Sequence, residues 1–209
     1  SAFGHVSTRI PASDHIMMTP SGPPGAAKLR DIVTLNLKGE KISGRGKPNR
    51  ELPIHTSIYR VRDDVQSIVH VHPPKVIAFS LAGKEIFPMD YEQRRFSPSV
   101  RIFGEPGENV YIDSDALGER MARALGQDLA LMIRGHGAVT VGDSYMNAHI
   151  KLARGMMGKA SITVSKRPEA KDGVGATFIK ENTIPHREDI KNKVGIIQLT
   201  ALFCRDNTY

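Results

Sequence analysis

The sequence is poor in cysteine and in aromatic residues. Its 209 residues include one cysteine, Cys204, no tryptophan, 5 tyrosines and 7 phenylalanines. A single cysteine excludes an internal disulfide and a cysteine-rich zinc site. Aromatic residues are too few, and basic residues too scattered, for a surface on which nucleic-acid bases stack. We therefore expect no nucleic-acid partner despite the net charge of +7, which we assign to a solvated surface biased toward anionic substrates.

Long apolar runs are also missing. No run approaches the roughly 20 residues that a membrane span needs, and no signal peptide is visible. We expect no membrane partner and a cytoplasmic location. The composition, 40% apolar and 24% charged, is that of an ordinary globular protein, and the length suits one domain over residues 1–209.

The pattern of apolar residues predicts strands and helices in mixed order. Strand patterns cover 3–10, 31–37, 41–44, 67–72, 85–89, 129–133 and 138–141, and helical spacing covers 50–62, 75–81, 115–125 and 145–157. Many of these strands are joined by tight turns, which favours a largely antiparallel or mixed sheet with helices packed on it.

The most informative short motif is His70-Val71-His72, at the end of an apolar strand pattern. Side chains two apart on a strand point to the same side, roughly 6.6 Å apart along the strand. Two imidazoles at this spacing can bind one metal ion. The alternative is one core histidine and one surface histidine. Pro73 follows directly and stops strand pairing, which places the pair near a strand end.

Two further residues complete a candidate metal site. His136 lies between Gly135 and Gly137, in a tight loop after an apolar strand, where it is either a third ligand or an ordinary turn histidine. Three histidines leave a coordination position open, as in catalytic metal sites. Glu51 begins a helix just before the His70 strand and can reach the open side as a proton carrier, for which we expect burial to raise its pKa. Glu51 can equally be a first-turn carboxylate stabilised by the helix dipole.

Together, several motifs in fixed order resemble the class II aldolase/adducin family. They are Gly4-His5-Val6-Ser7-Thr8-Arg9, Thr19-Pro20-Ser21-Gly22, Glu51-x-x-x-His55, Tyr59-x-x-Arg62-x-Asp64-Val65, Val69-His70-Val71-His72-Pro73, and Arg134-Gly135-His136-Gly137-Ala138-Val139 with Val141-Gly142. The resemblance runs from Phe3 to about Met157. The tail over residues 158–209 matches little.

The resemblance implies a three-layer α/β/α sandwich with a mainly antiparallel central sheet. It implies a homotetramer with active sites at subunit interfaces. It maps the ligands of a divalent ion onto His70, His72 and His136, and the family glutamate onto Glu51, as acid/base or displaceable ligand. Zinc is the first expectation for the ion, and manganese, iron or cobalt also suit this donor set.

The chain departs from the sugar-phosphate aldolases of the family where a phosphate is bound. Those enzymes carry Gly-Asn-x-Ser where this chain has Gly4-His5-Val6-Ser7, and a Ser-Ser pair where it has Asn49-Arg50. Arginine suits a planar carboxylate, with which it forms two parallel hydrogen bonds. The Gly-His-Val-Ser form is similar to a branch that includes decarboxylases of hydroxylated aromatic acids.

We therefore expect a metal-dependent carbon–carbon lyase acting on a small anionic substrate. The first hypothesis is decarboxylation of a hydroxylated, catechol-type carboxylic acid through a metal-stabilised enediolate or phenolate. The second is retro-aldol cleavage of a small hydroxy-keto compound or sugar phosphate, and the third is a metal-free, adducin-like binding module. Expected substrate contacts are His5, Ser7, Ser21, Gly22, Asn49 and Arg50.

Overall fold

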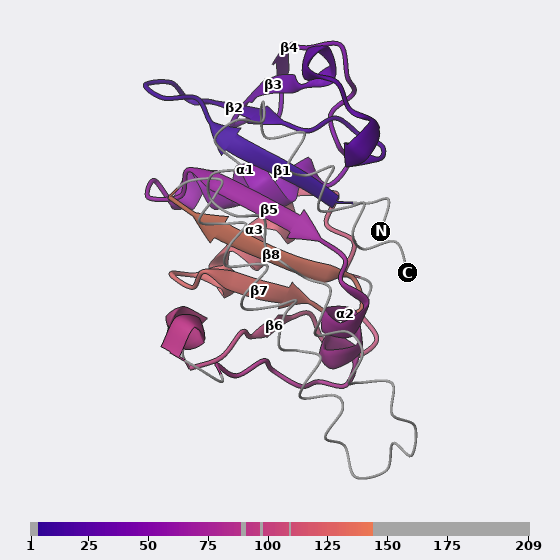
Figure 1. Ribbon diagram of the computed structural model, residues 1–209, viewed down its shortest axis with the longest axis vertical. Helices are drawn as coiled ribbons and strands as arrows, with labels where there is room; N and C mark the ends of the chain where they lie inside the picture. Colours follow the sequence, from indigo (N-terminus) through magenta and orange to yellow (C-terminus); the bar gives the residue numbers. More distant parts are fainter. Residues whose placement is uncertain (1–3, 89–90, 97, 109, 144–209) are drawn as a thin grey trace.

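The computed structural model describes residues 4–88, 91–96, 98–108 and 110–143. Its strands form one eight-stranded sheet in the order β4-β3-β2-β1-β5-β8-β7-β6 (Figure 1). The strands are β1 (Gly4–Arg9), β2 (His15–Met18), β3 (Val33–Asn36), β4 (Lys41–Ser43), β5 (Ser67–Val71), β6 (Ile102–Phe103), β7 (Ala130–Ile133) and β8 (Gly137–Gly142). Neighbouring strands are antiparallel except β6 and β7, which are parallel. The expectation of a mainly antiparallel sheet is confirmed.

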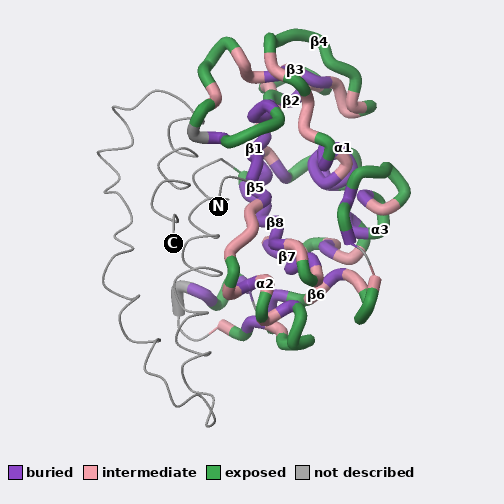
Figure 2. Tube along the Cα trace, turned by 90° about the vertical axis from the view of Figure 1, so that its right-hand side faces the viewer, coloured by how far each residue is buried: buried purple, intermediate pink, exposed green. Residues whose placement is uncertain are grey.

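Helices cover both faces of this sheet. The α-helices are α1 (Leu52–Val61), α2 (Pro74–Leu81) and α3 (Asp115–Leu125), and short 3₁₀ helices are η1 (Pro24–Ala26), η2 (Leu29–Asp31) and η3 (Tyr91–Phe96). Figure 2 shows α1 and α3 together on one side of the sheet. The core on that side contains side chains of both helices, whereas Val76 of α2 belongs to a second core. The arrangement is the expected α/β/α sandwich.

The two cores follow from the alternation of side chains along each strand. On β5, Ile68 enters the core beneath α1 and α3, while Val69 enters the core beneath α2. Leu131 and Met132 divide in the same way on β7. All four are buried, which explains why β5 and β7 read as continuous apolar runs instead of alternating ones.

The structure corrects one predicted strand and adds two. Residues 85–89 form no strand where described: Ile86 makes an isolated bridge to Val100, and Pro88 has no N–H for a ladder. The short strands β2 and β6 were not predicted. The former contains two methionines and a histidine, which are not strong strand formers. The predicted helix over 145–157 and the tail over 158–209 lie outside the described residues.

The ends of three elements meet where the site residues lie. The end of β5, the loop before β8 and the start of α1 come together on the α1 face of the sheet. In the described part of the chain, none of the helices has the length and apolar character needed to cross a membrane. The cytoplasmic location stays a prediction.

Candidate metal centre

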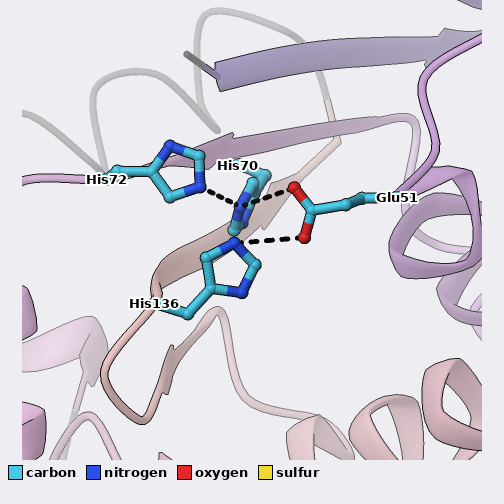
Figure 3. A group of neighbouring side chains, drawn as sticks. All are labelled: Glu51, His70, His72 and His136. Carbon is cyan, nitrogen blue, oxygen red and sulfur yellow. Dashed lines mark hydrogen bonds and ion pairs between the residues drawn. The ribbon is translucent and has the colours of Figure 1, made fainter. Parts of the chain in front are cut away.

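His70 and His72 point to the same side, as their spacing predicts. Their Nε2 atoms lie 3.0 Å apart at the end of β5, and their rings meet edge to face with centroids 4.6 Å apart (Figure 3). His70 is fully buried. Two nitrogen lone pairs at this distance repel each other unless a proton or a cation lies between them.

His136 comes to the same place from the loop between β7 and β8. Its ring stacks on His72 with centroids 4.9 Å apart. Its Nδ1 donates a hydrogen bond to the Val110 carbonyl over 3.0 Å. A carbonyl can only accept, so the proton lies on Nδ1 and Nε2 is available to a metal, which is the usual support of a ligating histidine.

Glycines on both sides of His136 shape this loop. Gly135 has a φ of +66°, a conformation that L side chains rarely adopt. A Cβ at Gly137 would lie 2.3 Å from the Val71 carbonyl oxygen and 2.9 Å from Cδ2 of His72. The two glycines therefore allow the loop to turn and to lie directly against the His70-x-His72 segment.

Glu51 supplies a carboxylate to this group of histidines. It lies just before the first residue of α1 and is 5% exposed. Its Oε1 lies 3.1 Å from Nε2 of His136, and its Oε2 lies 3.8 Å from Nε2 of His70. The Asn49 side chain accepts a hydrogen bond from the Glu51 backbone N–H over 2.9 Å, so Asn49 fixes the backbone that presents the carboxylate.

The four side chains fit a divalent ion. One donor atom from each of Glu51, His70, His72 and His136 lies within 4.8 Å of all the others. Oε1 of Glu51 is buried and makes no hydrogen bond of good geometry among the described residues, although Nε2 of His136 lies 3.1 Å away. A buried carboxylate oxygen is costly unless a positive charge balances it. Three imidazoles and one carboxylate form a donor set that suits zinc and neighbouring transition metals.

The pKa of Glu51 differs from our expectation. Burial raises it, but the contacts with His136 and His5 outweigh burial and lower the pKa to about 2. The predicted rise was wrong because it ignored how closely the imidazoles surround the carboxylate. In the opposite sense, burial lowers the pKa of His136, while the bond to Glu51 outweighs this and raises it. In the metal-free protein, Glu51 is ionised at every pH near neutrality.

We predict that the metal-free protein loses stability as the pH falls below 6.5. Burial lowers the folded-state pKa of His70 and His55 well below the ordinary histidine value of 6.5. Below pH 6.5 the unfolded chain therefore binds more protons than the folded one. Each group then contributes up to about 1.4 kcal/mol per pH unit. Urea denaturation at pH 6 and pH 5 should show a decrease of about 2 kcal/mol. An unchanged free energy of unfolding would mean that both histidines are charged in the fold.

Two of the predicted substrate contacts are buried behind Glu51. His5 is 2% exposed, and its Nε2 lies 3.4 Å from Oε2 of Glu51. Ser7 is fully buried, and its hydroxyl bonds to His55 and Tyr59. These contacts favour support of the site over direct contact between Ser7 and a substrate.

The other predicted substrate contacts lie at the surface or near it. Arg50 is exposed, with its guanidinium 6.0 Å from the centre of the Tyr111 ring. Ser21 and Gly22 are exposed in the loop after β2, where the Ser21 N–H donates to the Lys47 carbonyl. Direct contact of these residues with a substrate stays a prediction.

Sequence reasoning missed the role of three residues. Tyr111 is 40% exposed and lies 5.8 Å from the His136 ring, centre to centre. His55 and Tyr59, named above only as members of family motifs, make buried hydrogen bonds to His5 and Ser7. A signal was present for the last two, because Glu51, His55 and Tyr59 recur every four residues and so share one face of a helix.

Comparisons with known proteins agree with this architecture. The model of the Class II Aldolase and Adducin N-terminal domain matches residues 1–154. A 3,4-dihydroxyphthalate decarboxylase from Arthrobacter keyseri is 31% identical over 168 residues, which cover 70% of this chain and 63% of that protein. The chain therefore spans less than two thirds of that relative's length.

Two phosphate-sugar aldolases are also similar. An L-fuculose phosphate aldolase from Methanococcus maripaludis is 31% identical over 152 residues, which cover 71% of this chain and 77% of that protein. The solved structure of an L-fuculose 1-phosphate aldolase superposes with a TM-score of 0.70 at 20% identity, covering 98% of this chain and 86% of that one. With its motifs, its sandwich and its family match in agreement, the chain belongs to the class II aldolase and adducin family.

Proposed function

We propose that the protein is a metal-dependent carbon–carbon lyase. The observation that carries this proposal is the convergence of His70, His72, His136 and Glu51, with the buried Glu51 carboxylate placed among the three imidazoles. A binding module without a metal has no need for such a group, because buried ionisable side chains weaken a fold unless they are compensated.

The three histidines would hold the ion, with the Glu51 carboxylate beside it. A divalent ion there supplies positive charge close to the electron pair that a substrate keeps when a carbon–carbon bond breaks. Glu51 is ionised near neutral pH and lies beside the three histidines, so it is placed to accept a proton from the substrate and to return it to the reacting carbon. The surrounding burial limits the access of water to this exchange.

Decarboxylation of a hydroxylated aromatic acid is the reaction that we favour. Arg50 and Tyr111 lie on the side of His136, where a guanidinium and a half-exposed aromatic ring are near each other. The Arg50 guanidinium can bind a substrate carboxylate, and the Tyr111 ring can stack on the face of an aromatic substrate. Several relatives bear the name 3,4-dihydroxyphthalate decarboxylase, which supports a substrate of this class.

The decisive experiment measures carbon dioxide. The zinc- or manganese-loaded protein should release it from a dihydroxylated aromatic dicarboxylate or from catechol carboxylates. We expect Arg50→Gln to raise the KM by about tenfold or more, since a charge-assisted bond contributes about 1.5–3 kcal/mol. Arg45→Gln, which removes another exposed arginine, is the matched control and should leave the KM unchanged.

Retro-aldol cleavage is the alternative outcome, supported by the aldolases among the relatives. Release of an aldehyde and a ketone from a sugar phosphate, without carbon dioxide from any acid, would establish it and reject decarboxylation.

We also propose a homotetramer with sites at subunit interfaces, as the family resemblance implies. Light scattering of the protein as it elutes from a size-exclusion column measures its molar mass and so tests the number of subunits.

A further inference from the structure

Behind the candidate metal centre, four buried side chains form a continuous line of hydrogen bonds. Nδ1 of His5 lies 2.7 Å from Nε2 of His55. Nδ1 of His55 lies 2.6 Å from the hydroxyl of Ser7, which lies 3.0 Å from the hydroxyl of Tyr59. All four side chains are at most 2% exposed. This line begins at Glu51 and ends in the core beneath α1.

The sheet and α1 both contribute to this line. His5 and Ser7 are two apart on β1 and share one face, while His55 and Tyr59 are four apart on one face of α1. His5 is also the cross-strand partner of His70, with ring centroids 4.8 Å apart. His5 is therefore the residue of the line that contacts the candidate metal centre, through Glu51 and His70.

The Glu51 carboxylate sets the direction of the first bond in the line. It can only accept, so Nε2 of His5 carries the hydrogen that points to Oε2. At the other end of the line, Tyr59 donates to Ser7 and Ser7 donates to Nδ1 of His55, so Nε2 of His55 carries a hydrogen. Nδ1 of His5 is then the acceptor in its bond to Nε2 of His55.

The positions of the remaining hydrogens follow once Nδ1 of His5 is the acceptor. His55 donates from Nε2 to His5, so its own Nδ1 accepts the hydrogen of the Ser7 hydroxyl. The Ser7 oxygen in turn accepts from Tyr59. Tyr59 is a reliable donor because burial raises its pKa. The Arg9 guanidinium holds Tyr59 in place, donating to its backbone carbonyl over 2.5 Å and lying 4.8 Å from its ring centre.

We propose that His5 is a positioning residue for the Glu51 carboxylate. Held as the Nε2–H tautomer by His55, Ser7 and Tyr59, it retains Oε2 on the β1 side. Oε1 is thereby left to face His136 and the metal centre, where its proton exchange takes place. This inference rests on the proposed lyase function and adds the reason why histidine stands in the Gly4-His5-Val6-Ser7 motif.

The first test observes the tautomers directly and needs no activity. Long-range ¹H–¹⁵N spectra of the zinc-loaded protein, assigned with single histidine variants, should show His5 and His55 as neutral Nε2–H tautomers. Ser7→Ala removes the donor to His55 and should shift the ¹⁵N signals of both rings. Ser67→Ala is the matched control: it removes a buried hydroxyl on the adjoining strand that bonds to the Ser7 carbonyl, and it should leave both rings unchanged. An Nδ1–H tautomer of His5, or an insensitivity of both rings to Ser7→Ala, would overturn the proposal.

The second test measures turnover. His5→Ala should lower kcat by about 10–100-fold, as loss of a supporting hydrogen bond does, with the KM within about twofold. His5→Gln places an amide N–H near the position of Nε2 and should restore at least half of the lost kcat. Tyr59→Phe, which keeps the ring, should lower kcat by a smaller factor. A change in KM alone would instead make His5 a substrate contact, contradicting the positioning role.

The two tests separate this inference from the proposed function. If no substrate reacts but the tautomers are as expected, the lyase proposal fails and the hydrogen-bond line stands. If carbon dioxide is released and His5→Ala retains full kcat, the lyase proposal stands and the positioning role is rejected.

Discussion

Replacing His72 with alanine should remove tight metal binding while leaving the fold intact. His72 lies just after β5 and is partly exposed, so its loss leaves no cavity in either core. It provides one of three imidazoles, and its Nε2 lies 3.0 Å from that of His70. Loss of a mere supporting residue costs 10–100-fold in metal affinity. Loss of a ligand should therefore exceed about 100-fold.

Calorimetric titration with zinc or cobalt measures this loss. The unaltered protein should bind roughly one ion per chain at this site, and the ion should stabilise the fold by about 2.7 kcal/mol at a free concentration 100 times the Kd. His15→Ala is the matched control, since His15 lies on β2 and is about one third exposed. Equal affinity of the His72→Ala and His15→Ala variants would reject the metal centre, and full activity of His72→Ala would reject the mechanism.

The candidate metal centre was predictable because its signals are local. The alternation of a strand places His70 and His72 on one side, and glycines on both sides of His136 indicate a loop that must bend closely. Glu51 was predictable from its place before a helix that leads into the same strand. None of these inferences required knowledge of which strands are neighbours.

The hydrogen-bond line was not predictable, since it depends on register. His5 lies opposite His70 only because β1 pairs with β5 antiparallel in one particular register, and a shift of one residue would turn it to the other face. The pKa of Glu51 was mistaken partly for the same reason, because the contact of His5 with its carboxylate depends on that register.

Replacing Glu51 with glutamine should abolish most turnover without removing the ion. Glutamine keeps the size of the side chain but accepts no proton near neutral pH. General acid–base catalysis contributes about 10²–10⁴-fold, and we expect kcat to fall by that factor. Three histidines should still hold the metal, with an affinity lowered by no more than about 10–100-fold, since loss of a supporting group costs that much and the imidazoles remain.

The pH dependence of kcat/KM shows whether Glu51 acts as a proton carrier or as a metal ligand. In the metal-free protein, contacts with His136 and His5 hold its pKa at about 2, so Glu51 does not titrate between pH 4 and 8. At acidic pH the loss of activity should come from protonation of the histidines, which must be neutral to bind an ion. The residual activity of Glu51→Gln should therefore show the same decrease at acidic pH. Glu119→Gln, at an exposed position on α3, is the matched control for the charge change. A loss of metal affinity above 100-fold in Glu51→Gln would make the carboxylate a ligand first and would move the proton transfer to another group.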